Sequence, residues 1–319
     1  MGNQNLTFQS KIPGPKTIKH YTLPNGISLL CYSNMAKKSI YLVGLLNSGS
    51  IYDSSDKLGL ANFTASMLMR GTQQFNFKEI HNLLESAGAN FGFSVSVENT
   101  LFHGKALAED LPLLINILSD CLRNPTFPQE YFERLCAQLL ASLAIRDQDT
   151  AKVASLEYDR ILFNHHPYGR AIDGYKKTIM QIMREDISSF HKKYYSPKNA
   201  VIVIAGAMEA DEMYEEVKKG IGDWENYLQC PPQDFPSINP LQETVRKHIH
   251  IPNKSQTDLM MGTLGPKRTS PDYLPLFVGN HVLGQFGLMG RIGKIVRKQA
   301  NIAYHASSTL SAWSKVGSW

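Results

Sequence analysis

The stretch that decides the fold is residues 59–72, which read G-L-A-N-F-T-A-S-M-L-M-R-G-T. Apolar residues recur at helical spacing from 58 to 69 and fill most of the circumference, which is typical of a buried helix. Gly71 ends this helix at its C-terminal side. Positions i, i+3 and i+4 share one face of a helix. That face carries Asn62, Ala65 and Ser66.

Around this helix, strands and helices are predicted in groups. Alternating or β-branched runs predict strands at 26–32, 40–47, 90–98, 101–107 and 200–205. Helical spacing and stop signals predict helices at 78–86, 111–122, 128–145, 151–163 and 182–195. The strands 90–98 and 101–107 form an expected antiparallel pair. This grouping predicts an α+β domain rather than alternating parallel units.

The second half of the chain repeats this order after a proline-rich linker that contains Pro231, Pro232, Pro236 and Pro240. Strands are predicted at 248–251 and 257–264, followed by an apolar helix at 273–283. We therefore expect two homologous domains, each an antiparallel-rich sheet flanked by helices. The predicted boundaries are 1–228, a linker at 229–245, and an incomplete second domain at 246–319. Only the start of the second copy is present, because the sequence stops soon after a strand-like stretch at 303–312. We therefore expect that this chain is a fragment, or that the rest of the second domain lies on another chain.

Composition places the chain among folded globular proteins, since 43% of its 319 residues are hydrophobic and 19% are charged. The net charge is +5, and we expect the basic residues to be spread along the chain rather than collected in one segment. Such a distribution argues against a nucleic-acid partner. No apolar stretch approaches the ~20 residues of a membrane span. The polar residues 1–19 do not resemble a signal peptide, so a cytoplasmic, soluble protein with reduced thiols is expected. Its cysteines are Cys31, Cys121, Cys136 and Cys230.

Residues 59–72 resemble the signature helix of the pitrilysin/insulinase family, which includes mitochondrial processing peptidase. In active members this helix reads G-L-A-H-x-x-E-H-x-L-x-x-G-T, an inverted zinc-binding motif. The frame matches at Gly59, Leu60, Ala61, Leu68, Gly71 and Thr72. Asn62 replaces the first ligand His, Ala65 the catalytic Glu and Ser66 the second ligand His.

These replacements remove the chemistry of the motif. Two imidazoles at i and i+4 can bind one zinc ion while the carboxylate acts as a base toward zinc-bound water. Asn, Ala and Ser supply neither imidazole ligands nor a base. The family's third ligand is a Glu on a later helix, which corresponds to the helix after Pro128, yet residues 135–145 read L-C-A-Q-L-L-A-S-L-A-I. The resemblance therefore implies no catalytic residue, no metal and no cofactor on this chain, with zinc only on a partner.

Further family-like stretches extend the resemblance over residues 20–313. They lie at 84–89, 124–127, 165–169 with Gly174 beyond, and 194–200 with the strand to Gly206. In the second half, residues 283–291 (L-G-Q-F-G-L-M-G-R) resemble the family's glycine-rich turn, formed by Gly284, Gly287 and Gly290. The resemblance implies that Arg291 at its end, and Tyr304 thirteen residues later, bind substrate.

Other interpretations of these residues stay open. Without the family frame, Arg291 and Tyr304 are an ordinary surface Arg and sheet Tyr. The glycine spacing fits neither a dinucleotide fingerprint nor a Walker loop. His248 and His250 share one face of a predicted strand, but two histidines without a third ligand are weak metal candidates. The pair at 165–166 is best explained by a structural turn.

A chain that retains the Arg and Tyr but lacks the metal site resembles a catalytically silent subunit of a heterodimeric zinc metallopeptidase. Its implied role is to close a chamber over an extended peptide that a zinc-bearing paralogue hydrolyses. A homodimer is the other expected assembly. The alternative function is a structural core subunit, like the metal-free relatives in the respiratory cytochrome b–c complex; an active peptidase with a rebuilt metal site is a third. A mature eukaryotic form would belong in the mitochondrial matrix.

Overall fold

The computed structural model describes residues 13–225 and 235–319. These divide into two compact units: residues up to 145 with 171–233, and 146–170 with the C-terminal part from 234 onward. The predicted boundary at 228 and part of the predicted linker lie outside the described residues. The helix at 150–163, predicted in the N-terminal domain, groups with the C-terminal segment. The predicted domain boundaries therefore stay a prediction.

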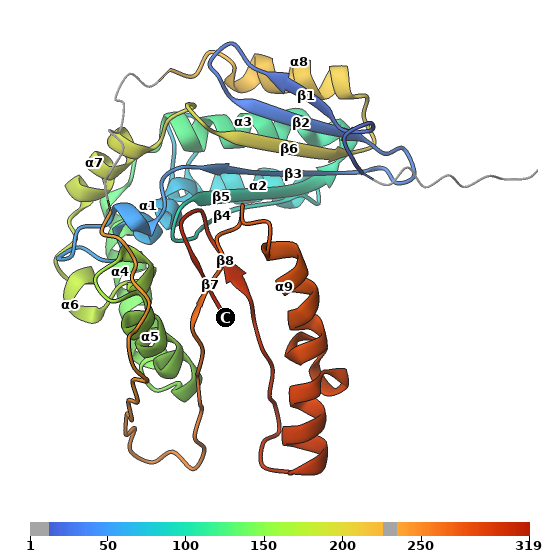
Figure 1. Cartoon of the computed structure of the whole chain (residues 1–319). Coiled ribbons are helices and arrows are strands. Elements are labelled where there is room, and N and C mark those ends of the chain that lie inside the picture. The colour runs from blue at the N-terminus through green and yellow to red at the C-terminus, as the bar shows by residue number, and fades with distance from the viewer. Residues whose placement is uncertain (1–12, 226–234) are drawn as a thin grey trace, which may run out of the picture. The chain divides into compact units, whose positions relative to one another are not determined.

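The first unit is built on a six-stranded sheet with the order β1-β2-β6-β3-β5-β4 (Figure 1). Strands β2 and β6 are parallel, and all other neighbours are antiparallel, including the predicted pair of β4 and β5. The short strand β1 was not predicted. The six strands are Lys19–Thr22, Ser28–Ser33, Ser39–Leu46, Asn90–Val95, Thr100–Leu107 and Val201–Gly206. The mixed α+β class is confirmed.

Each helix predicted before the linker is present. α1 is two residues shorter at each end than the predicted 58–69, and at its C-terminal end the chain tightens into a 3₁₀ turn at Leu68–Arg70. The short α6 was not predicted. The helices α1 to α8 are Leu60–Met67, Phe77–Ser86, Leu111–Arg123, Gln129–Arg146, Thr150–Phe163, Lys176–Ile179, Arg184–Tyr194 and Ala210–Ile221. No helix among the described residues is long and apolar enough to span a bilayer.

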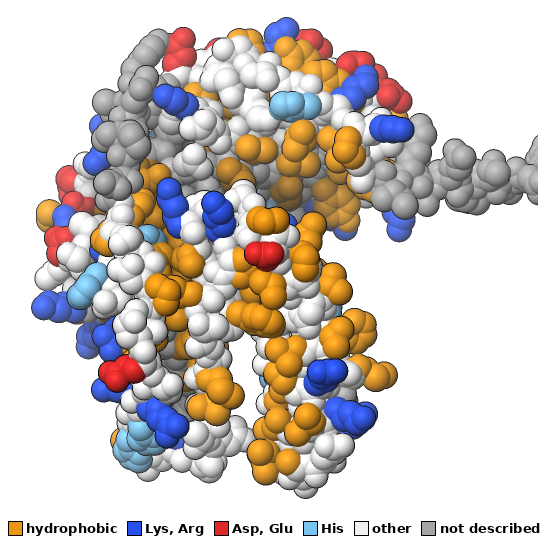
Figure 2. Space-filling view, viewed as in Figure 1, with side chains coloured by type: hydrophobic (Ala, Val, Ile, Leu, Met, Phe, Trp, Pro, Cys, Tyr) orange, Lys and Arg blue, Asp and Glu red, His pale blue; other side chains and the backbone are white. Residues whose placement is uncertain are grey.

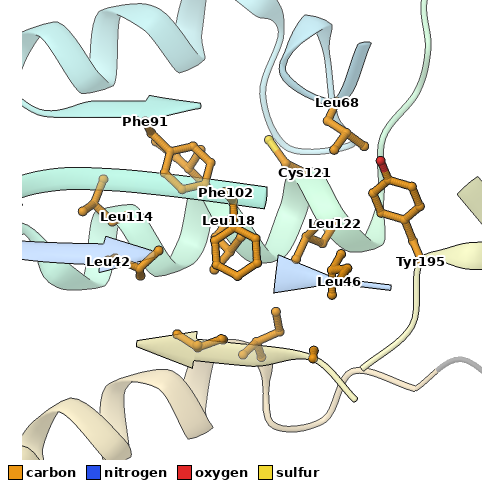
Figure 3. Packing of buried hydrophobic residues seen from close by; sticks show 14 of the residues in the cluster. Leu42, Leu46, Leu68, Phe91, Phe102, Leu114, Leu118, Cys121, Leu122 and Tyr195 are labelled. Carbon is orange, nitrogen blue, oxygen red and sulfur yellow. The ribbon is translucent and has the colours of Figure 1, made fainter. Parts of the chain in front are cut away.

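Helices cover one face of this sheet. α3 packs against β5 and α8, and α8 packs against β2. Figure 3 shows leucines of α3 facing the apolar side chains of the strands, where Leu42, Leu46 and Phe102 are almost fully buried. The alternate residues on the opposite face remain exposed: Tyr41, Val43, Leu101 and Leu107. The period-2 pattern therefore produces one packed face and one accessible apolar face.

Buried thiols are part of the first unit's core. Cys31 and Cys121 are free and buried, and Cys136 is free and half-buried. Burial raises the pKa of Cys31 to about 12 and also raises the pKa of Cys121, so both stay protonated at neutral pH. Cys230 lies outside the described residues. The expectation of reduced, buried thiols agrees with Cys31 and Cys121.

The second unit contains α5, a small sheet and α9 (Tyr273–Asn280). The sheet has the order β7-β9-β8, formed by Leu264–Gly265, Gly317–Ser318 and Ser311–Ala312. Trp313 contacts Phe163 and Tyr168 with centroid distances of 5.5 and 5.2 Å. This aromatic cluster packs the β8–β9 turn against α5 and the 3₁₀ turn Pro167–Gly169.

Two strand predictions in the second unit are wrong. Residues 248–251 form no strand, and of 257–264 only Leu264 enters one. Of 303–312, only Ser311 and Ala312 are in a strand. A strand forms only where a neighbour pairs with its backbone. Residues 248–251 and 257–262 are mostly exposed and have no ladder partner among the described residues, whereas Thr263 exchanges two backbone hydrogen bonds with Trp319 next to β7. The apolar helix is confirmed over Tyr273–Asn280, after which it widens into the π-helical segment His281–Gln285.

Candidate functional site

An aspartate from the preceding loop fixes the start of the signature helix α1. Asp53 is 3% exposed, and its carboxylate accepts hydrogen bonds from the backbone N–H of Gly59 (2.8 Å) and of Ala61 (2.9 Å). These N–H groups are free at a helix N-terminus, where a negative charge is also favoured. This role was not predicted from the sequence, because Asp53 lies outside the usual capping position.

The glycine that precedes α1 is required by its backbone and by its surroundings. Gly59 has φ +98°, and a Cβ there would lie 2.7 Å from Cδ1 of Ile179. Opposite it, a Cβ on Gly174 would lie 2.1 Å from the carbonyl oxygen of Leu58. The Thr178 hydroxyl donates to the same carbonyl at 2.7 Å. The family-like glycines Gly59 and Gly174 therefore allow the same two backbone segments to approach each other closely.

The other end of the signature helix is held by a second family-like stretch. The N–H of Thr126 donates to the carbonyl of Gly71 at 3.0 Å, and Thr72 forms an antiparallel bridge with Pro125. Thr72 also closes its own turn, because its hydroxyl accepts from the N–H of Phe75 at 3.0 Å. The motif frame is thus explained by packing at both ends of α1.

The residues that replace the zinc motif lie on α1 beside α4. Ala65 is buried, and Asn62 and Ser66 are half-buried. The neighbouring Phe63 stacks on Phe132 of α4 with ring centroids 5.0 Å apart, so the helices that correspond to the family's ligand helices touch. The assignment of the family's ligand positions to these two helices stays a prediction.

The donors available there do not fit a zinc ion. The carboxylates of α4 are Glu130 and Glu133, both exposed near its first turn. Glu130 pairs with Arg134 at 2.6 Å, and Glu133 accepts from the Gln129 side chain at 2.8 Å. Across the described ranges, no three His, Cys, Asp or Glu residues are grouped closely enough to hold a metal. No catalytic step can be derived through zinc on these residues.

The glycine-rich turn in the second unit closes tightly on its own backbone. Gly284 is buried, and a Cβ there would lie 2.6 Å from the backbone nitrogen of Ser308. A Cβ on Gly290 would lie 3.0 Å from the Cα of Gly284, and Gly287 has φ +56°. These positions need glycine for packing and turn geometry.

A buried amide, missed by the sequence analysis, organises this turn. Asn280 at the end of α9 is fully buried. Its Oδ1 accepts from the Ser308 hydroxyl (2.6 Å) and from the Trp319 indole N–H (2.8 Å), and its Nδ2 donates to Gln285 (3.0 Å). The only signal was a polar residue within an otherwise apolar helix.

The predicted substrate-binding pair is accessible but is not joined by a contact. Arg291 is exposed, and Tyr304 is 85% exposed. The guanidinium carbon of Arg297, rather than that of Arg291, lies 4.6 Å from the centre of the Tyr304 ring. Arg297 was not a predicted site residue. It holds the Tyr304 ring by a cation–π contact and leaves the side chain open to solvent.

The predicted histidine positions are structural or exposed. His166 is buried, and its Nδ1 accepts from the N–H of Tyr168 at 3.2 Å, which agrees with a structural turn. His248 and His250 are exposed and line a cavity of about 840 Å³ between α5 and the extended segment 240–264, all within the second unit.

Two family models match the chain. Residues 30–174 match "Insulinase (Peptidase family M16)", and residues 181–319 match "Peptidase M16 inactive domain". A crystal structure of the peptidase M16 inactive domain from Pseudomonas fluorescens is 25% identical with a TM-score of 0.87, covering 94% of this chain and 72% of that one. A protease from Helicobacter pylori shares the fold, with a TM-score of 0.84 and 18% sequence identity. The superposed part covers 96% of this chain and 74% of the protease chain.

Curated relatives include peptidase subunits. The mitochondrial-processing peptidase subunit beta of Saccharomyces cerevisiae is 26% identical over 291 residues, which cover 88% of this chain and 60% of the relative. The probable mitochondrial-processing peptidase subunit beta of Arabidopsis thaliana is 28% identical over 198 residues, which cover 62% of this chain and 37% of the relative. An uncharacterized zinc protease of Mycobacterium leprae is 24% identical over 298 residues, which cover 93% of this chain and 66% of the relative. The chain thus spans between 37% and 66% of the length of these relatives.

Proposed function

The chain belongs to the pitrilysin/insulinase family of peptidases, and we propose that within this family it is a catalytically silent subunit. In this proposal it pairs with a zinc-bearing paralogue, closes a chamber with it and helps it to bind an extended peptide. The observation that carries the proposal is the contrast within the signature helix. The packing frame is intact at Gly59 and Gly71, and at Gly174, which packs against Leu58 and Gly59, whereas none of the chemical side chains of the motif is present.

The loss of chemistry is coordinated, which supports a non-catalytic role. Selection for the fold keeps residues whose replacement would create clashes, and the clash distances at Gly59 and Gly174 are of that kind. Asn62, Ala65 and Ser66, by contrast, offer neither an imidazole ligand nor a base. The match of residues 181–319 to a domain described as inactive agrees with this proposal, although several relatives are named zinc proteases.

The proposed contribution of this chain is to orient the peptide backbone. An extended peptide presents free carbonyl groups at alternate positions. Arg291 offers a permanently charged, forked donor, and Tyr304 offers a hydroxyl on a rigid stem. Both side chains are exposed, so a peptide can reach them. Neither group can act as a nucleophile toward a peptide or replace a metal.

The chain by itself is expected to bind no stoichiometric zinc and to hydrolyse no peptide. A catalytic zinc site normally has three protein ligands, and the positions inherited from the family supply none of the usual ones. Elemental analysis of the purified chain, together with an assay on a fluorogenic peptide library, tests this. About one tightly bound zinc per chain, with activity that a chelator abolishes, contradicts the proposal.

Restoring the motif on α1 is expected to leave the chain inactive. The triple variant Asn62→His, Ala65→Glu and Ser66→His regains two zinc ligands and a base. However, the segment 135–145 of α4 still lacks a carboxylate, so a third ligand is missing. The same assay measures the result, with circular dichroism as the control for folding. Turnover by the triple variant would show that the third ligand comes from elsewhere.

A further inference from the structure

The positive charge of the chain is concentrated in its C-terminal part, contrary to the even spread assumed from the sequence. Residues 235–319 contain ten Lys and Arg against three Asp and Glu, whereas residues 1–234 contain 23 against 25. After Asp272 there is no acidic residue at all. The segment that carries the proposed substrate-binding pair is therefore the most basic part of the protein.

Four cations follow the glycine-rich turn within eight residues: Arg291, Lys294, Arg297 and Lys298, here called the basic cluster. Arg291, Lys294 and Lys298 are exposed, and Arg297 is half-buried against Tyr304. None of the four forms an ion pair with a described carboxylate. Some cations elsewhere in the chain are paired, for example Lys57 with Asp186 and Arg123 with Asp223. The charge of the basic cluster is thus not neutralised by the chain itself.

Apolar side chains are interleaved with these cations. Phe286, Met289, Ile295 and Ile302 are each more than half exposed. On the visible face in Figure 2, the lower end of the helical segment that begins with α9 shows blue side chains among orange ones and no red one. The surface can therefore contact both carboxylates and apolar side chains of a bound polypeptide.

We propose that the peptide held by Arg291 and Tyr304 is acidic, with carboxylates that pair with the basic cluster and apolar side chains between them. This inference rests on the proposed function and specifies its substrate class. Successive side chains of an extended peptide point to opposite sides, so one side presents every second residue to this surface. Uncompensated charges of one sign select a partner of the opposite sign and repel a basic one.

The shape of the segment favours a peptide over an anionic lipid surface. Helices that lie on membranes are continuous and separate a charged face from an apolar face. Here the helix is interrupted between the π-helical segments His281–Gln285 and Gly293–Gln299, and exposed Ile295 lies directly beside Lys294. The cations and the apolar groups are mixed rather than separated.

Binding of three fluorescein-labelled ten-residue peptides tests the inference. The peptides alternate Thr with Glu, Gln or Lys, and their affinities for the chain are measured by fluorescence anisotropy. We expect the Glu peptide to bind at least about tenfold more tightly than the Gln peptide at 50 mM salt, and the Lys peptide to bind most weakly. Because salt screens exposed charges, the preference should fall below about threefold at 300 mM salt.

Matched variants locate the preference. Lys294→Gln combined with Lys298→Gln should remove most of the preference for the Glu peptide while leaving the affinity for the Gln peptide unchanged. Lys267→Gln, which removes an exposed cation outside the basic cluster, should change neither affinity. A preference that survives in the double variant overturns the assignment to this cluster.

The remaining outcomes separate this inference from the proposed function. If all three peptides bind equally and Arg291→Ala weakens each of them, the acidic preference is wrong but peptide binding stands. If no peptide binds, both fall. Binding to vesicles with about 30% phosphatidylserine, or to a single-stranded oligonucleotide, without binding of the Glu peptide replaces the inference by a membrane or nucleic-acid surface.

Discussion

Replacing Asp53 with alanine is expected to lower the free energy of unfolding of the first unit by about 3–5 kcal/mol. The carboxylate is buried and accepts two backbone hydrogen bonds, from Gly59 and Ala61. Hydrogen bonds to a charged group contribute about 1.5–3 kcal/mol each, and a buried N–H left without a partner costs a similar amount. Loss of the cap therefore destabilises the start of α1 and the packing that depends on it.

Urea unfolding followed by far-ultraviolet circular dichroism measures this effect. Asp53→Asn should lose about half as much stability, because its amide has one acceptor oxygen for two N–H groups. Asp56→Ala, an exposed carboxylate three residues further along the same loop, should stay within about 0.5 kcal/mol of wild type. If Asp53→Ala unfolds at the same urea concentration as wild type, the capping role is wrong.

Most of the first unit could be predicted because its signals are local. The run of β-branched and aromatic residues at 40–47, bounded by turn-forming residues, predicts a strand, and the structure has β3 at Ser39–Leu46. Gly71 and Pro128 mark helix ends, and helices end and begin there. A strand pattern and a stop signal are sufficient when the pairing partners are present on the same chain.

The predictions that failed concern contacts that local sequence patterns do not specify. A strand was predicted at 257–264, but a strand needs a neighbour that pairs with it, and the local sequence does not specify one. The cap from Asp53 depends on how its loop folds back onto α1, which no capping motif marks. In the same way, Arg297 could not be distinguished from Arg291 as the residue on Tyr304, because spacing alone does not place a side chain over a ring.

Arg291→Ala, in a complex with an active zinc-bearing partner, is expected to lower kcat/KM by about ten- to a hundredfold. A charged hydrogen bond to a peptide carbonyl contributes roughly 1.5–3 kcal/mol, which corresponds to that range. Tyr304→Phe should have a smaller effect, because it removes a neutral hydroxyl and keeps the ring that Arg297 contacts. Neither variant should change the zinc content or the affinity of the subunits, since both side chains are exposed and hold no metal.

The same complex distinguishes substrate binding from a scaffold role. Lys267→Ala removes an exposed cation away from the glycine-rich turn and serves as the control. If Arg291→Ala lowers kcat/KM and Lys267→Ala does not, the effect belongs to a specific contact rather than to net charge. A scaffold needs only its packing, so a scaffold subunit would tolerate both variants, although its complete removal would abolish activity. Wild-type kinetics for Arg291→Ala and Tyr304→Phe, with activity lost only when the whole chain is absent, would therefore favour the structural core role over substrate binding.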